Sequence, residues 1–251
     1  MKTIAFINQK GGVAKTTSCI NVGAALASLG YKVLLIDLDP QGSLSKSLGC
    51  RDLEDADTIN EVIRGADPNG AIIKDLFNYD ILPANIRLSG AEIDLIMEPG
   101  RDTLLKDAIK RIKTKYDYIL IDCPPSLSIL TLMALAAANQ LIIPVAAQYL
   151  PLDGLAQLLK TIDKAKERLN KKLSICGILI TMYNSRRALD ADILQTIRDR
   201  FAKEAFTEVI KINSKLAEAP TAGKDIFTYA PKSPGAESYL NVAQELIKRT
   251  M

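Results

Sequence analysis

The 251-residue sequence contains no histidine and no tryptophan, and it has only four cysteines. Without histidine, the chain cannot build a Ser-His-Asp triad or a Cys-His nucleophile pair. Its cysteines are isolated along the chain, with no CxxC spacing, at Cys19, Cys50, Cys123 and Cys176. Disulfide frameworks, zinc sites and iron–sulfur sites are therefore not expected.

Long apolar runs are also missing. No uninterrupted run reaches the roughly 18 to 20 residues that a membrane span requires. The first ten residues, MKTIAFINQK, lack the apolar segment of a signal peptide, so we expect a cytoplasmic protein. Hydrophobic residues make up 48% of the chain and charged residues 24%, which suits one soluble domain with a sizeable core.

The net charge is only +3, but it is unevenly distributed. Residues 1–159 carry 15 Lys and Arg against 18 Asp and Glu, whereas residues 160–251 carry 17 against 11. This asymmetry favours an anionic partner for the C-terminal part of the chain. Ordinary solvated helix faces would give the same counts, so charge alone does not decide between the two.

Short apolar runs alternate with helical patterns along the whole chain. The strands are expected at 2–8, 32–37, 79–83, 116–122, 140–146, 173–183 and 207–212, and the helices at 16–30, 101–113, 126–138, 152–169, 189–201 and 235–249. Strands separated by crossover helices predict an α/β fold, with a mainly parallel twisted sheet flanked by helices on both faces. Residues 42–100 are the least regular part, and no linker divides the 251 residues, so we expect a single domain.

The stretch NQKGGVAKTT (8–17) lies between the first expected strand and the first expected helix. It resembles the phosphate-binding pattern G-x-x-x-x-G-K-[ST], but Gln9 and Ala14 stand where that pattern has glycine. Lys15 and Thr16 are in place. A lysine there reaches the β- and γ-phosphates, the hydroxyl ligates Mg²⁺, and the helix N-terminus favours negative charge.

Acidic residues follow two other expected strands. VLLIDLDPQG places Asp37 and Asp39 two residues apart, and DYILIDCPPS ends its apolar run at Asp122. An apolar run that ends in Asp is weak evidence alone, because such residues often cap a strand. In an α/β sheet, however, ligands bind beyond the carboxyl ends of the strands. The phosphate loop, the Asp pair and the final Asp together predict a nucleotide–magnesium site.

With these motifs in view, the sequence resembles the deviant-Walker P-loop ATPases of the ParA/Soj/MinD superfamily over nearly its full length. The matching segments are KGGVAKTT (10–17), DLDPQG (37–42), YDYILIDCPPSLSILT (116–131), PVAAQYLPLDGLAQLL (144–159), GILITMYNSR (177–186) and LAEAPTAGKDIFTYAPKSPGAESY (216–239). The last three segments are similar to ParA/Soj partition ATPases specifically. The loop of this family reads K-G-G-x-x-K-[ST], which explains Gln9 and makes Lys10 the signature lysine.

The resemblance implies a weak ATPase that uses ATP and Mg²⁺ and forms an ATP-sandwich homodimer. The implied nucleotide-binding residues are Lys10, Gly11, Gly12, Val13, Ala14, Lys15, Thr16 and Thr17, with Lys211 and Asn213 beside the adenine. Lys10 would act on the partner's nucleotide, as an arginine finger does. The implied catalytic residues are Lys10, Lys15 and Asp39, with Asp39 orienting the attacking water. The implied magnesium shell is Thr16, Asp37, Asp39 and Asp122. Relatives often have proline at the position of Lys211, so we expect its contact through the backbone.

The resemblance also implies binding of double-stranded DNA without sequence preference, and hydrolysis stimulated by a ParB-like protein. The candidate DNA-binding residues are Arg186, Arg187, Lys211 and Lys215. Where relatives often read R-N-x-R, this chain has Ile212 to Lys215, so one arginine is lost and DNA binding could be weaker. A DNA-bound protein would be nucleoid-associated. Because the chain begins at its first strand, we expect neither an N-terminal helix-turn-helix extension nor operator-specific repression.

Two alternatives share the nucleotide motifs. A MinD-like membrane ATPase would need a basic amphipathic tail, but ESYLNVAQELIKRTM has only Lys248 and Arg249 as basic residues. A terminal helix that packs on the core is the better interpretation of this segment, and a membrane partner is not expected. The other alternative is an ATP-gated cargo positioner that does not bind DNA. The sequence does not specify whether the cargo is a chromosome, a plasmid or a protein cluster.

Ala14 leaves one structural question open, because most relatives have glycine there. With a positive φ, alanine would cost about 1 kcal/mol or more. With a negative φ, it would stabilise the protein by roughly 0.4–1 kcal/mol. Since the remaining motifs are intact, we expect ATP and Mg²⁺ to bind in either case.

Overall fold

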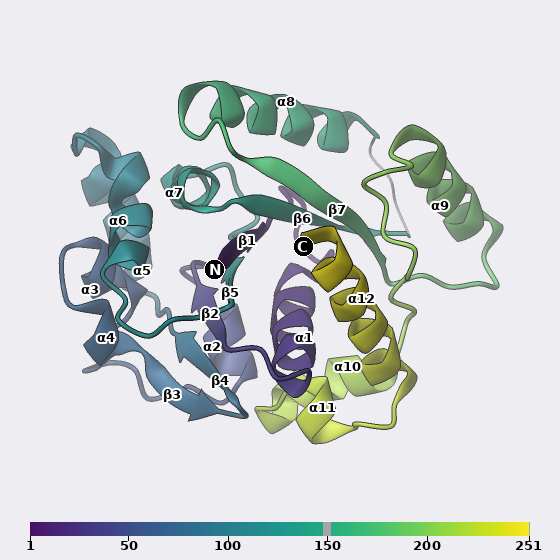
Figure 1. The fold of residues 1–251 in the computed structure, drawn as a ribbon, viewed down its shortest axis with the longest axis horizontal. Helices are drawn as coiled ribbons and strands as arrows, with labels where there is room; N and C mark the ends of the chain where they lie inside the picture. The colour runs from purple at the N-terminus through teal and green to yellow at the C-terminus, as the bar shows by residue number, and fades with distance from the viewer. Residues whose placement is uncertain (148–151, 251) are drawn as a thin grey trace.

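Seven strands form one twisted sheet in the computed structural model, which describes residues 1–147 and 152–250 (Figure 1). The strands are β1 (Lys2–Phe6), β2 (Val33–Asp37), β3 (Ile73–Leu76), β4 (Tyr79–Leu82), β5 (Tyr118–Asp122), β6 (Gln140–Ala146) and β7 (Ser174–Thr181). Their order across the sheet is β3-β4-β2-β5-β1-β6-β7. All neighbours are parallel except β3 and β4, which confirms the expected α/β class.

Helices cover both faces of this sheet (Figure 1). Six helices lie where the sequence predicts them: α1 (Lys15–Ser28), α6 (Leu104–Lys110), α7 (Ile129–Ala137), α8 (Leu152–Arg168), α9 (Ala188–Arg200) and α12 (Pro234–Thr250). The other described helices have four to seven residues: α2 (Ser43–Ser47), α3 (Ile59–Ile63), α4 (Pro68–Ala71), α5 (Leu88–Asp94), α10 (Ser214–Glu218) and α11 (Ile226–Tyr229). Three 3₁₀ turns complete the described elements: η1 (Leu95–Met97), η2 (Arg101–Thr103) and η3 (Ala219–Ala222).

Two apolar clusters, one on each face of the sheet, hold these layers together. One joins α1, α2 and α12 to side chains such as Ile4 and Leu35. The other joins α3, α5, α6, α7 and α8 to side chains such as Ile36 and Ile121. Every residue of β2 and β5 is buried, as expected for central strands of a parallel sheet. This burial fixes the strand ends, where the polar side chains of the candidate site begin.

The segment 42–100 is more regular than the sequence indicates. Its helices have four to seven residues, too short for a clear apolar period. Side-chain caps begin two of them, Thr58 at α3 and Asp67 at α4. In α3, for example, Thr58 and Glu61 form a capping box. Strand β3 is only half-buried at the sheet edge and reads IKDL, so it lacks the apolar run of the inner strands. A tight turn with positive φ at Phe77 and Asn78 joins it to β4.

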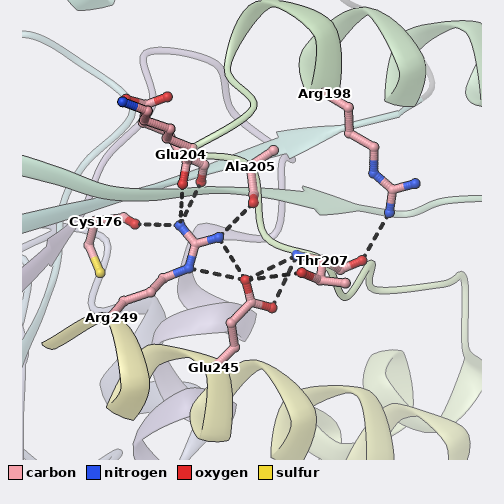
Figure 2. Close-up of polar contacts among 8 residues, drawn as sticks. Cys176, Arg198, Glu204, Ala205, Thr207, Glu245 and Arg249 are labelled. Atoms are coloured by element: carbon pink, nitrogen blue, oxygen red, sulfur yellow. Dashed lines mark hydrogen bonds and ion pairs between the residues drawn. The ribbon is translucent and has the colours of Figure 1, made fainter. Parts of the chain in front are cut away.

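The prediction of a strand at 207–212 is wrong, because no strand that the structure describes covers these residues. The segment that follows α9 runs beside β7 and the residues just after it, where two isolated bridges join Ile178 to Ala205 and Tyr183 to Lys211. The N–H of Ile210 also donates to the carbonyl of Ile180 at 2.8 Å, but no continuous ladder forms. Between the bridges, the backbone of Thr207 is held by side chains. Arg198 Nη2 donates to the carbonyl of Thr207 at 3.0 Å, and the N–H of Thr207 donates to the carboxylate of Glu245 (Figure 2).

The C-terminal helix α12 packs on the core, as expected. Tyr239, Val242 and Leu246 are fully buried, so its apolar face is already covered. Near its end, Arg249 donates to the carbonyls of Cys176, Lys203, Glu204 and Ala205 and pairs with Glu245 at 2.6 Å (Figure 2). Within the part of the chain that the structure describes, no helix is both long and apolar enough to cross a bilayer.

Candidate nucleotide-binding site

The loop between β1 and α1 is clamped to neighbouring strand ends. Asn8 Nδ2 donates to the carbonyl of Pro144 at 2.8 Å, and Asn8 Oδ1 accepts from the N–H of Lys10 at 3.0 Å. The buried hydroxyl of Thr181, the last residue of β7, donates to the carbonyl of Val13 at 3.1 Å. These bonds connect the loop to β6 and β7, two strands that are distant in sequence.

Ala14 directly precedes helix α1 and has the left-handed conformation, with φ 58° and ψ 35°. Of the two signs of φ that the sequence left open for Ala14, the backbone therefore adopts the positive one. Gly12 is also left-handed, with φ 70°. No side chain caps the start of α1, and its first turn has no acidic residue. The helix therefore presents uncapped N–H groups and the positive end of its dipole to a phosphate.

Lys15, Thr16 and Asp122 meet at the carboxyl edge of the sheet. Lys15 Nζ donates to the carbonyl of Lys10 at 3.2 Å, and Thr16 Oγ1 donates to Asp122 Oδ2 at 2.7 Å. Asp122 is fully buried, and its Oδ1 has no hydrogen-bond partner among the described residues. Burial raises the pKa of Asp122, and the nearby Asp37 raises it further. Burial also lowers the pKa of Lys15, although Asp122 opposes this effect.

These residues fit Mg²⁺ as it is usually held beside phosphates. The ion keeps several waters and takes only one or two protein ligands, the rest of its shell being phosphate oxygens. The Thr16 hydroxyl and the orphaned Oδ1 of Asp122 are oxygens of the required kind. Among the described residues, no group of three or more acidic, cysteine or histidine side chains forms a separate metal cage.

Asp37 and Asp39 lie at the end of β2, beside Asp122, which pairs in register with Asp37. Asp37 is fully buried and accepts three hydrogen bonds, from the N–H of Asp39 at 3.2 Å and from the N–H and hydroxyl of Ser45 at 2.9 and 2.7 Å. Burial raises its pKa to about 6, although the bonds from Ser45 oppose the shift. Asp39 accepts from the N–H of Gln41 at 2.9 Å. Asp37 thus holds the turn that carries Asp39.

A pocket of about 370 Å³ opens beside the loop. Its lining residues are Ala14, Thr17, Met182, Ile210, Lys211, Ile212, Asn213, Leu216, Ala217, Pro220 and Tyr239. It therefore brings Lys211 and Asn213 next to the phosphate loop, although about 200 residues separate them in sequence. The carbonyl oxygen of the Asn213 side chain accepts from the N–H of Lys215 at 2.9 Å and caps α10.

Sequence reasoning missed the apolar walls of this pocket. Met182 lies in a left-handed turn after β7, with φ 53°, and Leu216 and Pro220 come from α10 and η3. The sequence marks LAEAPTAGKD as part of a family motif but does not indicate that it forms a pocket wall. An apolar lining with a few polar groups is typical of a small-molecule or cofactor pocket.

Comparison with known proteins identifies the family of this chain. The model of the AAA domain family matches residues 1–175. The sporulation initiation inhibitor protein Soj of Bacillus subtilis is 42% identical over 98% of both chains. The chromosome-partitioning ATPase Soj of Treponema pallidum is 43% identical over 99% of this chain and 98% of its own. The chain belongs to the Soj/ParA family of partition ATPases. As a member of this family, it is an ATPase.

A solved structure with the same fold comes from Mycobacterium smegmatis, where the protein is described as a cobyrinic acid a,c-diamide synthase. It has an ATP analogue and magnesium bound. Its TM-score against this chain is 0.88, with 37% identity over 100% of this chain and 96% of its own. The likeness extends over the whole sheet and its helices.

The residues that the Soj/ParA resemblance assigns to partners lie at the surface. Lys10 and Gly11 are exposed at the outer side of the phosphate loop. Arg186 and Arg187 are exposed in the loop between β7 and α9. The bridge between Tyr183 and Lys211 places that loop beside the segment that carries Lys211.

Two further contacts shape this basic surface. Lys215 Nζ pairs with Glu218 Oε2 at 2.8 Å, so its charge is partly neutralised within the chain. The buried Asp190 accepts from the N–H of Asn184 at 2.8 Å and holds the loop of Arg186. Sequence reasoning missed Asp190, because an Asp in the first turn of a helix usually serves only that helix.

Proposed function

We propose that the protein is a DNA partition ATPase that binds ATP and Mg²⁺ as a homodimer and is reset by hydrolysis. This proposal rests on one observation: a polar cluster and a pocket meet at the first turn of α1. The Lys15–Thr16–Asp122 cluster lies at one end of α1's first turn, and the pocket that runs from Ala14 and Thr17 to Asn213 begins at the same turn. One nucleotide can place its phosphates in the first and its base in the second.

In this proposal, Lys15 neutralises phosphate charge, and the uncapped N–H groups of α1 bind phosphate oxygens. Thr16 and Asp122 would hold Mg²⁺, Thr16 directly and Asp122 through water, and the ion would supply charge stabilisation when bound. Asp39 orients the attacking water. Asp37, whose oxygens already accept bonds from Asp39 and Ser45, acts by fixing the position of Asp39.

Lys10 supplies positive charge to the nucleotide of the partner subunit in the homodimer. A cation delivered in trans stabilises the charge that develops on the transferred phosphoryl group. Hydrolysis then depends on dimer formation, and its rate is low until a ParB-like partner stimulates it. The exposure of Lys10 and Gly11 is consistent with this role.

Double-stranded DNA is the proposed partner of Arg186, Arg187 and Lys211, with Lys215 as a weaker contributor. These cations can neutralise phosphates without reading base sequence. The surface pair of Lys215 with Glu218 contributes little to stability and can exchange for a phosphate contact. A membrane role is disfavoured because the apolar residues of α12 are buried against the core.

The test is DNA binding by the Arg186→Glu/Arg187→Glu variant, measured by fluorescence anisotropy with a duplex of arbitrary sequence. Wild-type protein should bind only with ATP and Mg²⁺, and its affinity should fall steeply with salt because binding releases counterions. The variant should lose binding but keep its basal ATPase rate. Lys171→Glu/Lys172→Glu is the matched control, since these exposed neighbours lie before the start of β7, whereas Arg186 and Arg187 follow its end.

Three results would contradict the DNA proposal: nucleotide-independent binding, a strong preference for one sequence, or equal loss in the control variant. If wild-type protein hydrolyses ATP as a dimer but binds no DNA, the cargo-positioning alternative replaces DNA partition. In that case the nucleotide part of the proposal still stands.

A further inference from the structure

A second pocket, of about 480 Å³, lies next to the nucleotide pocket. It is lined by Lys46, Ser47, Arg51, Pro220 and Thr221. The first three come from α2 and the residues that follow it, and the last two from η3. Pro220 also lines the nucleotide pocket, so the two pockets are neighbours. No residue of the phosphate loop is among the residues that line this second pocket.

The lining of this pocket is basic and rich in hydrogen-bond donors. Arg51 is exposed and makes no hydrogen bond or ion pair with any residue that the structure describes. Lys46 uses one of its three N–H donors on the carbonyl of Gln41, at 2.6 Å. Ser47 and Thr221 add hydroxyls. Acidic residues follow Arg51 in the sequence, beginning with Asp52, but no carboxylate lines the pocket.

We propose that this pocket binds a phosphate group through Lys46 and Arg51. A planar guanidinium and an ammonium group, supported by two hydroxyls, match the oxygens of a phosphate. The phosphate belongs either to a nucleic-acid backbone or to a free polyphosphate, and both sources present the same chemistry to these side chains. This site is separate from the phosphate loop and from Arg186 and Arg187.

Hydrogen bonds connect the pocket to the turn that carries Asp39. Lys46 Nζ donates to the carbonyl of Gln41, and the N–H of Gln41 donates to Asp39 Oδ1 at 2.9 Å. An anion that draws the Lys46 ammonium away from Gln41 breaks the hydrogen bond to the Gln41 carbonyl. Occupation of the pocket therefore changes the rate of hydrolysis, a step that rests on the proposed role of Asp39.

Binding is tested by isothermal titration of pyrophosphate into the Lys15→Ala variant, in which the phosphate loop is disabled. This experiment needs neither ATP hydrolysis nor DNA. We expect saturable binding that weakens about tenfold or more when Lys46→Ala and Arg51→Ala are added, because each removes a charged hydrogen-bond donor. Adding the exposed pair Lys115→Ala and Arg168→Ala instead should leave binding unchanged.

The proposal is overturned if the Lys15→Ala protein binds no pyrophosphate, or if the Lys46 and Arg51 substitutions have no more effect than the control pair. Thermal unfolding of each variant verifies that the chain is folded.

The source of the phosphate is identified by DNA binding of the ATP-loaded protein. With Lys15 intact, Lys46→Ala/Arg51→Ala should weaken duplex binding and reduce its salt dependence if the pocket takes a backbone phosphate. Unchanged DNA binding, together with pyrophosphate binding, assigns the pocket to a free polyphosphate.

Coupling to Asp39 is tested at saturating ATP by adding pyrophosphate to wild-type protein and to Arg51→Ala. Pyrophosphate that competes with ATP at the phosphate loop affects the ATPase rates of both proteins equally. A change in rate in the wild type alone therefore shows coupling through the pocket. Identical responses would refute the coupling.

Discussion

Ala14 holds a conformation that alanine disfavours, at the point where the phosphate loop becomes helix α1. Its φ of 58° costs an L-residue about 1 kcal/mol or more, whereas glycine adopts it freely. We therefore expect Ala14→Gly to raise the free energy of unfolding by roughly 0.5 kcal/mol, because the greater entropy of the unfolded chain offsets part of the relieved strain. Urea denaturation measures this change.

The control for Ala14 is Ala27→Gly, within the right-handed part of α1. It should lower stability by about 0.5–1 kcal/mol, because glycine is a poor helix former. If Ala14→Gly is destabilising as well, the positive φ of Ala14 is wrong. ATP should bind to both wild type and Ala14→Gly; binding by the glycine variant alone would mean that the natural protein is a degenerate ATPase.

Asp37 makes ligand-free stability depend on pH. Its folded-state pKa is raised to about 6 by burial, against about 3.9 in the unfolded chain. A raised pKa means that its stabilising contribution is complete below pH ~4 and is lost as the pH rises through about 6. Relative to Asp37→Asn, wild-type protein should lose about 2–3 kcal/mol between pH 4 and pH 7. Urea denaturation without nucleotide or Mg²⁺ measures it, and a pH-independent difference between the two proteins would refute the shift.

At the scale of elements, Arg249 ties helix α12 to the segment between α9 and the nucleotide pocket. It donates to four backbone carbonyls and pairs with Glu245, which in turn accepts from the N–H of Thr207 (Figure 2). We expect Arg249→Ala to lower stability by about 3 kcal/mol, because several charge-assisted hydrogen bonds are lost together. Chemical denaturation followed by circular dichroism provides the measurement.

The neighbouring Lys248→Ala is the matched control, because Lys248 is exposed on the same turn. It should change stability by no more than about 0.5 kcal/mol. Equal effects of the two substitutions would show that the Arg249 contacts do not stabilise α12.

Elements with a long apolar run could be predicted from the sequence, and elements fixed by local polar contacts could not. The inner strands and the six helices that the sequence predicts follow from the apolar patterns of their own residues. Strand β3 and helix α3 depend instead on a turn with positive φ and on the Thr58–Glu61 capping box. The wrong prediction of a strand at 207–212 shows the same limit. Its apolar residues suggested a continuous ladder, but Arg198 and Glu245 bind the backbone of Thr207, and only part of the segment bonds to β7.

At the scale of the whole molecule, the sequence predicted the polar half of the candidate site better than the apolar half. Lys15 and Thr16 begin helix α1 and Asp122 ends strand β5, and the carboxyl ends of parallel strands meet at one edge of the sheet, so these residues come together. The φ of Ala14 could not be predicted, because alanine is compatible with both signs. Nor could the Asp37–Ser45 bonds or the pocket between Lys46 and Pro220, which depend on how loops fold back on one another.

The central claim is that two copies of this chain complete each other's ATPase sites, with Lys10 acting on the partner's nucleotide and Asp39 on its own. Lys10→Ala and Asp39→Ala should each bind ATP, and each alone should hydrolyse it very slowly. In a mixed dimer, however, the Lys10→Ala subunit keeps its own Asp39 and receives an intact Lys10 from the other subunit. The site of the Asp39→Ala subunit lacks both residues, so each mixed dimer has one complete site.

The decisive measurement is therefore the ATPase rate of the two variants mixed in equal amounts. Random pairing makes half of the dimers mixed, so the rate should recover to about a quarter of the wild-type value. Lys15→Ala mixed with Asp39→Ala serves as the control and should show no recovery, because the Lys15→Ala subunit does not bind ATP. If the Lys10→Ala and Asp39→Ala mixture remains as slow as either variant alone, Lys10 does not act across the dimer, and the account is contradicted.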